Sequence, residues 1–176
     1  MTVKKITGDP NTPIGKAKPK RDVTPKEVKL TLGRDDVERL KKKWPWADDS
    51  IDEIETRQVV EYLKPAERIH FVNEMCRVMK KGAKAYITCP YWASNMSMAD
   101  LAIEWPPIAE GWFYHLDPVW RKANNSQEKR YTCTFNATWG YGLHPSILTK
   151  NQEYQQHAVS FWKEAAQVLS ATLIKK

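Results

Sequence analysis

Apolar side chains along the chain recur first with the spacing of a strand and then with the spacing of a helix. Residues 27–33 alternate apolar and polar side chains, which predicts a strand. The charged segment 34–43 follows and predicts a short helix that is capped by Asp35 or Asp36. Pro45 ends this helix, because proline has no amide hydrogen to donate within a helix interior.

Residues 51–90 predict a strand, a helix and a second strand in succession. The first strand covers 51–60 and reaches a loop near Arg57, and the second ends at Pro90. Between them, residues 64–82 predict a helix with Gly82 in the position directly after its last turn. Its apolar face consists of Ile69, Val72, Met75, Cys76 and Met79. Such a unit implies parallel strands joined by a right-handed crossover.

The last third of the chain predicts a strand, a helix and a final strand after an irregular aromatic segment. Residues 91–125 are aromatic and broken by prolines, and 130–143 predict a long strand. Residues 149–169 predict a helix, and 170–176 predict the last strand. The helix is expected to bury Tyr154, Val159, Phe161, Trp162 and Ala166. This alternation of strands and helices predicts an α/β fold.

The positive charge of the chain is concentrated at one end. The 176 residues carry a net charge of +7, and residues 1–26 hold seven basic and two acidic side chains, so this segment alone contributes 7 − 2 = +5. We therefore predict a flexible basic arm over 1–26 and one domain over 27–176. The arm permits weak binding of nucleic acid, whereas the nearly neutral remainder does not favour a basic surface for DNA.

The cysteines and histidines do not have the spacing of a metal site or of a disulfide framework. Cys76, Cys89 and Cys133 are odd in number and far apart, which predicts buried free thiols in a reducing compartment. The four histidines show no ligand spacing, so no metal is expected. The chain also has no apolar run of the ~20 residues that a membrane span needs, and a cytoplasmic protein is the expectation.

Two stretches together resemble a known family. "PWADDSIDEIETRQVVEYL" (45–63) and "VNEMCRVMKKGAKAYITCPY" (72–91) are similar to the second half of class I S-adenosylmethionine (SAM) dependent methyltransferases. The aromatic segment 90–124 resembles a phage-type branch of that family, and the similarity spans 44–176. The resemblance implies a Rossmann-like, mostly parallel sheet flanked by helices, with SAM as the methyl donor. If the chain is phage-encoded, it would act in the host cytoplasm.

The resemblance also implies roles for particular residues. Gly33 and Asp36 would lie beside the methionine and adenosine parts of SAM, and Arg57 would line the cleft at the carboxyl ends of the strands. The loop before the strand 51–60 would border the adenine with Trp46, Asp48 and Asp49. Pro90 and Tyr91 would orient the methyl acceptor at the end of the next strand. The alternative for this loop is structural: the acids cap a turn and the tryptophans belong to the core.

The amino-terminal half of the family pattern is shortened in this chain. About forty residues are missing relative to a complete half built from a ~30-residue strand–helix–strand unit and a further strand. Residues 27–33 correspond to the first family strand or, in a second alignment, to the third, and neither alignment supplies an acid for the ribose. Tyr62 replaces a frequent histidine, and Ala102 and Ile103 replace threonine and histidine of the phage-type branch. A degenerate cofactor site is therefore expected.

Three functions remain open from the sequence. The chain is an active methyltransferase, which a partner chain or homo-oligomer could complete by supplying the missing strands. Alternatively, it is an inactive methyltransferase fold that binds a protein, such as a host factor, at the exposed sheet edge formed by 27–32. The third possibility is a weak nucleic-acid binder that uses the arm 1–26 together with exposed aromatic side chains.

Overall fold

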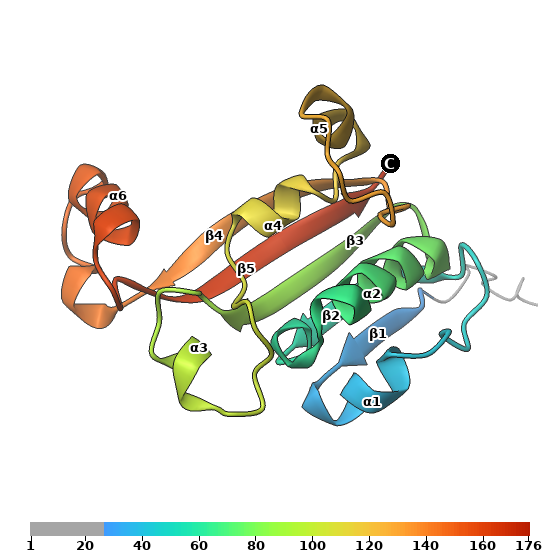
Figure 1. Ribbon diagram of the computed structural model, residues 1–176, viewed down its shortest axis with the longest axis horizontal. Helices are drawn as coiled ribbons and strands as arrows, with labels where there is room; N and C mark the ends of the chain where they lie inside the picture. Colours follow the sequence, from blue (N-terminus) through green and yellow to red (C-terminus); the bar gives the residue numbers. More distant parts are fainter. Residues whose placement is uncertain (1–26) are drawn as a thin grey trace, which may run out of the picture.

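The computed structural model describes residues 27–176, and these residues form a five-stranded sheet with helices (Figure 1). The predicted arm and its nucleic-acid role fall on 1–26, outside the described residues. The strand order is β1-β2-β3-β5-β4. The strands are β1 (Lys29–Leu32), β2 (Ile51–Arg57), β3 (Met79–Pro90), β4 (Phe135–Leu143) and β5 (Ala166–Lys175).

The sheet is mostly parallel, as the sequence predicted. β1 pairs with β2 and β2 with β3 in parallel, whereas β5 lies antiparallel between β3 and β4. Four strands therefore run in one direction and β5 alone runs in the other. The predicted strand–helix–strand unit is confirmed, with α2 (Pro65–Val78) between β2 and β3.

The remaining helical segments are short. They are η1 (Arg34–Asp36), α1 (Val37–Leu40), η2 (Val60–Tyr62), α3 (Met96–Ala99), α4 (Gly111–Tyr114), α5 (Pro118–Ala123), η3 (Pro145–Ile147) and α6 (Gln152–Phe161). No helix of 27–176 is both long and apolar enough to cross a membrane.

Helices α1, α2 and α4 lie on the same side of the sheet and cover that face (Figure 1). The strand order advances from β1 to β2 to β3 in a single direction. Because parallel crossovers are right-handed, both connections must then pass over the same face. The buried side chains of that face include Leu32, Ile54, Ala85, Ile87, Ala171 and Leu173.

The opposite face is not covered by residues 27–176. Its positions follow from the strand register, in which Lys29, Glu53, Lys84, Ile174 and Asn136 lie in one row across the sheet. A second row holds Thr31, Glu55, Tyr86, Thr172 and Thr138, and a third holds Arg57, Thr88, Ser170 and Gly140. None of these residues is buried, and nearly all are polar or glycine. The domain thus has two layers, a sheet and one layer of helices.

Trp44 belongs to the core. Its side chain is 2% exposed, and its ring contacts Phe71 of α2 edge-on, with the ring centres 5.3 Å apart. The indole nitrogen donates to the carbonyl of Leu40 at 3.2 Å, and the backbone amide donates to Glu74 at 2.7 Å. These contacts fix the turn after α1 against α2, and the core alternative for this tryptophan is correct. All three cysteines are buried and free, as predicted.

Several predicted element boundaries are wrong. The strand predicted over 130–143 begins at Phe135, the helix predicted over 149–169 covers Gln152–Phe161, and the last strand begins at Ala166 rather than at 170. The junction of the helix 64–82 with the next strand differs as well. α2 ends at Val78, and Gly82 lies inside β3 with a φ of 79° rather than after the helix. The pairing of β2 with β3 jumps from Ile51–Met79 to Glu53–Lys84, so the chain bulges around Gly82. Met79 has helical spacing from Cys76, but it pairs with Ile51 as the first residue of β3 and so belongs to the sheet and not to the helix.

The buried side predicted for the last helix is also wrong. α6 buries only Ala158, while Phe161 is 73% exposed and Trp162 is 44% exposed. Ala166 is buried, but as the first residue of β5. The reason is positional: α6 projects beyond the end of the sheet, so most of its apolar side chains have no strand beneath them (Figure 1).

Candidate functional site

The carboxyl ends of β1, β2 and β3 lie at one edge of the sheet, and several predicted site residues meet there. Gly33 follows β1, Arg57 ends β2, and Pro90 ends β3 with Tyr91 directly after it. A Cβ atom on Gly33 would lie 4.0 Å from the carbonyl oxygen of Arg57, so these two segments are adjacent. In open α/β sheets, ligands bind at this edge.

Trp46, Asp48 and Asp49 lie at the opposite edge, because they precede β2. A seven-residue strand is about 20 Å long, which separates them from Arg57 by that order of distance. Asp48 pairs with Arg77 at 2.6 Å, and Asp49 pairs with Lys175 at 2.7 Å. The structure therefore does not bring these two acids to the edge that holds Gly33.

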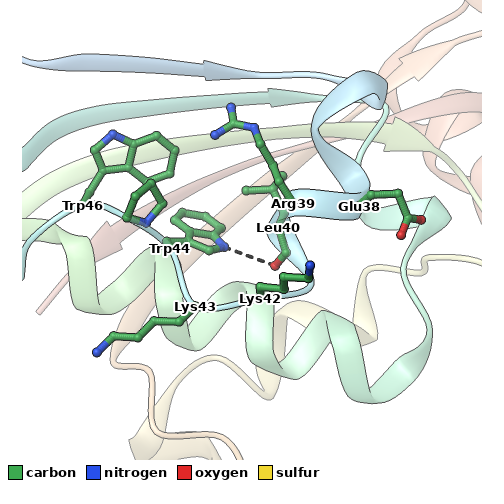
Figure 2. Close-up of a pocket in the computed structure, with 8 residues that line it drawn as sticks. Glu38, Arg39, Leu40, Lys42, Lys43, Trp44 and Trp46 are labelled. Carbon is green, nitrogen blue, oxygen red and sulfur yellow. Dashed lines mark hydrogen bonds between the residues drawn. The ribbon is translucent and has the colours of Figure 1, made fainter.

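Trp46 is half-buried and borders a hollow of about 440 Å³ lined by α1 and the loop after it (Figure 2). Its ring contacts that of Trp44 edge-on at 5.7 Å, and the guanidinium of Arg39 lies 5.4 Å from its ring centre. The hollow is lined by Lys42 and Lys43 as well.

The turn after β1 satisfies its own polar groups. The amide of Gly33 donates to Asp36 at 2.8 Å, and the side chain of Arg39 donates to the same carboxylate at 2.8 Å. Partial burial raises the pKa of Asp36, but these hydrogen bonds outweigh it, and the pKa lies below its usual value. Both oxygens of this acid are thus engaged within the turn, by Gly33 and by Arg39.

A strap, defined as residues 100–106, crosses the edge. The hydroxyl of Tyr62 donates to Asp100 at 3.1 Å, and Arg34 pairs with the same carboxylate at 3.2 Å. The guanidinium of Arg34 also lies 4.4 Å from the centre of the Tyr62 ring. These three side chains join the turn after β1, the turn after β2 and the strap.

Arg68 of α2 holds the buried part of the strap. Its guanidinium donates to the carbonyls of Glu104 at 2.8 Å and Pro106 at 2.5 Å, and to that of Val60 at 3.0 Å. The amide of Glu104 in turn donates to the carbonyl of Glu61 at 2.8 Å. The side chain of Arg68 is buried, so the strap is attached through a desolvated cation.

Glu61 is a buried acid at the same edge, and sequence reasoning missed it. The residue is 2% exposed, and neither carboxylate oxygen has a hydrogen-bond partner within residues 27–176. Burial raises the pKa of Glu61 to about 7, and the nearby backbone amides of Glu61 and Val59 and the charges of Arg68 and Arg34 offset part of this rise. The segment "VVEYL" contains the signal, a single acid among apolar residues directly after a strand.

Tyr91 is enclosed, and its neighbour Trp92 is the ring that faces solvent. Tyr91 is 2% exposed, and its hydroxyl lies 3.3 Å from Glu110. Burial raises the pKa of the Tyr91 hydroxyl to about 12. Trp92 is 47% exposed and packs edge-on against Tyr91.

Among the described residues, no three His, Cys, Asp or Glu side chains group as metal ligands.

Comparisons with known proteins identify the fold and no closer relationship. No protein-family model matches the chain, and no curated protein matches it by sequence. A SAM-dependent methyltransferase from Archaeoglobus fulgidus is similar in structure, with a TM-score of 0.55 at 10% identity over 85% of this chain and 87% of that one.

Two more distant structures are the YcgJ protein from Bacillus subtilis and phosphoethanolamine N-methyltransferase 2 from Haemonchus contortus. The first has a TM-score of 0.44 at 11% identity, covering 85% of this chain and 92% of that one. The second has a TM-score of 0.42 at 11% identity, covering 85% and 49%. The likeness to the Archaeoglobus protein shows that this chain has a SAM-dependent methyltransferase-like α/β fold.

Proposed function

We propose that this chain is a SAM-dependent methyltransferase-type domain with a degenerate donor site, so that it does not transfer methyl groups by itself. The observation that carries the proposal is the strand order. Ligand crevices in open α/β sheets form where the order reverses and neighbouring connections pass to opposite faces. Here the parallel strands advance from β1 to β3 in one direction, with both connections over one face.

The residues at the strand ends do not fit a nucleoside donor. The Gly33 amide and both oxygens of Asp36 are engaged within the turn. Asp100 of the strap is held by Arg34 and Tyr62. Asp36 and Asp100 are therefore not free to bind the ribose hydroxyls, and Asp35, the remaining acid of this turn, is exposed to solvent. We attribute this arrangement to a shortening of the chain in its donor half.

The uncovered face of the sheet argues against a partner that restores a complete enzyme. Parallel strands that are covered on both faces carry nearly continuous apolar side chains. This face instead presents Lys29, Lys84, Thr138 and Ser170, which suit contact with water. The two-layer form is thus consistent with a chain that folds without a further helix layer.

Isothermal titration of the full chain with SAM tests this proposal. We expect no saturable heat at ligand concentrations up to about 1 mM, with circular dichroism confirming a folded protein. One-to-one binding at micromolar Kd, about −8 kcal/mol, would contradict the degenerate site and restore the active-enzyme hypothesis. S-adenosylhomocysteine serves as the second ligand, because it shares the nucleoside.

A protein-binding role is the second candidate, and the edge strand favours it. β1 is the outermost strand of the sheet in residues 27–176 and pairs only with β2. A partner strand, such as one of a host factor if the chain comes from a phage, could add to this edge by backbone hydrogen bonds. Hydrogen exchange would detect it as new protection of the amides of 29–32 in the complex. Unchanged exchange there would exclude this mode.

A further inference from the structure

Exposed apolar side chains gather at one end of the molecule. Within residues 27–176, thirteen large hydrophobic residues are exposed, and nine of them lie in the two segments 92–105 and 148–162. They are Trp92, Met96, Met98, Leu101, Trp105, Leu148, Tyr154, Phe161 and Trp162. α3 and α6, which belong to these segments, lie at the same end of the sheet (Figure 1). Apolar surface concentrated in this way marks a binding region more often than a chance distribution.

The two segments enclose a hollow of about 320 Å³ between α3 and the end of α6. Backbone contacts fix them together: the amide of Glu164 donates to the carbonyl of Ala93 at 3.0 Å, and the Glu164 carboxylate accepts from the amide of Asn95. The amide of Tyr91 donates to the carbonyl of Gln167 at 2.9 Å. The hollow is therefore held in shape by the fold, and its volume is at the small end of ligand pockets, which span about 300–1,000 Å³.

The residues that line the hollow are mostly aromatic or apolar and include one lysine. Trp92, Phe161 and Trp162 supply three rings, and Met98 supplies a polarisable thioether that adapts to aromatic surfaces. The Trp162 ring is oriented by an edge-on contact with Tyr154 at 5.3 Å. Lys163 also lines the hollow, and within residues 27–176 its ammonium group has no carboxylate at ion-pair distance. Ser160 adds a hydroxyl oxygen whose proton is donated to Gln156.

We propose that this hollow is a binding site for a small planar aromatic molecule that carries a negative charge. The rings would stack on the aromatic part of the ligand, and Lys163 would pair with its carboxylate or sulfonate group. The site is built from segments after β3 and before β5 and uses neither Gly33 nor Asp36. Its occupancy therefore does not depend on SAM, and it can be present whether or not the donor site works.

Two dyes of matched shape test the proposal on the full chain. 1-Anilinonaphthalene-8-sulfonate carries the anion, and N-phenyl-1-naphthylamine has the same rings without it. We expect saturable one-to-one fluorescence enhancement with the sulfonate dye. Trp92→Ala and Trp162→Ala should each weaken both dyes about tenfold, because both lose stacking area. Lys163→Ala should weaken the sulfonate dye about fivefold and leave the neutral dye within twofold.

Matched controls make the result specific to the hollow. Trp105→Ala removes an indole that is 73% exposed at the same end but does not line the hollow, and Lys122→Ala removes an exposed lysine of α5. Both should bind the dyes like the wild type. Non-saturable binding, an equal loss in Trp105→Ala, or an equal effect of Lys163→Ala on both dyes would overturn the proposal. So would self-association by light scattering that Trp162→Ala abolishes, which would assign the hollow to a second copy.

Discussion

At the scale of single residues, Glu61 is the position where burial and charge conflict most strongly. Its carboxyl group lies beneath the strap without a hydrogen-bond partner, and the charged groups near it are Arg68 of α2 and Arg34 of η1. The titratable thiol of Cys89 and hydroxyl of Tyr62 lie near it as well. Because an ionised carboxylate is costly in such surroundings, the proton is retained to a higher pH in the folded state.

The stability of the protein should therefore fall with rising pH through Glu61. The pKa is about 7 in the folded state against a usual value of 4.5, so the protonated form stabilises the fold fully below pH 4.5. That contribution is lost as the pH rises through 7, and it amounts to roughly 3 kcal/mol at about 1.4 kcal/mol for each pKa unit.

Glu61→Gln should remove this pH dependence, because the amide does not ionise. Urea unfolding at pH 5 and pH 8.5 measures this dependence. Between these two pH values, the free energy of unfolding of the wild type should fall by a few kcal/mol more than that of the variant. Asp100→Asn provides a control at the same edge with a partly exposed acid. Parallel stability curves for wild type and Glu61→Gln would show that Glu61 does not titrate in this range.

At the scale of elements, the bulge in β3 shows how the sheet overrides a helical pattern. Gly82 adopts a φ of 79°, which glycine accepts at no steric cost and other residues disfavour. The bulge carries Lys80 to Asp52, where the two side chains pair at 2.7 Å. The same hydrogen-bonded register that produces the bulge thus replaces the last turn of the predicted helix.

Gly82→Ala should destabilise the protein by about 1 kcal/mol, because alanine is strained at this positive φ although no atom lies near its Cβ. Gly140→Ala is the matched control: it is an exposed strand glycine with equally open space and no positive φ, and its effect should be near zero or slightly stabilising. Thermal unfolding compares the two. An equal effect at both positions would mean that the backbone of Gly82 is not constrained.

The sequence predicted which segments form strands and helices better than it predicted what each segment packs against. Strand periodicity located β1, β2 and β3 to within a few residues, because alternation reports directly on the buried face. The pattern of α6 failed, since apolar spacing shows that a helix has an apolar side but not whether a sheet lies beneath Phe161 or Trp162. In the site, chain order placed Gly33, Arg57 and Tyr91 at one edge, whereas Asp48 and Asp49 precede a strand and so fall at the other. Glu61 and Arg68 required the three-dimensional path of the strap.

At the scale of the whole molecule, residues 27–176 carry a single layer of helices, unlike a sheet that is covered on both faces. One direction of strand order leaves the second face uncovered by residues 27–176, and in our proposal the same direction leaves no reversal point for a donor crevice. The exposed apolar surface lies at the same end of the sheet, on the segments after β3 and before β5 that carry α3 and α6. This end of the fold thus holds both the internally bonded turn after β1 and the open aromatic hollow beside the end of β3.

A pair of lysine substitutions on β5 tests whether the bare face contacts water. Ile174 lies on that face and is 38% exposed, whereas Leu173 lies on the covered face and is fully buried. Ile174→Lys should change the free energy of unfolding by no more than about 0.5 kcal/mol. Leu173→Lys should cost roughly 4 kcal/mol or more, because it buries an unpaired charge. A large loss in Ile174→Lys would show that another segment or chain covers this face.

The most direct test of the account is a titration of the isotope-labelled chain with S-adenosylhomocysteine, followed by amide chemical shifts. We predict that the amides of Gly33, Asp36 and Arg57 do not shift at ligand concentrations up to about 1 mM, because the turn that holds Gly33 and Asp36 is closed by its own hydrogen bonds and Arg57 lies directly beside it. Saturable shifts centred on these three residues would contradict it and would establish a working nucleoside site at the ends of β1 and β2.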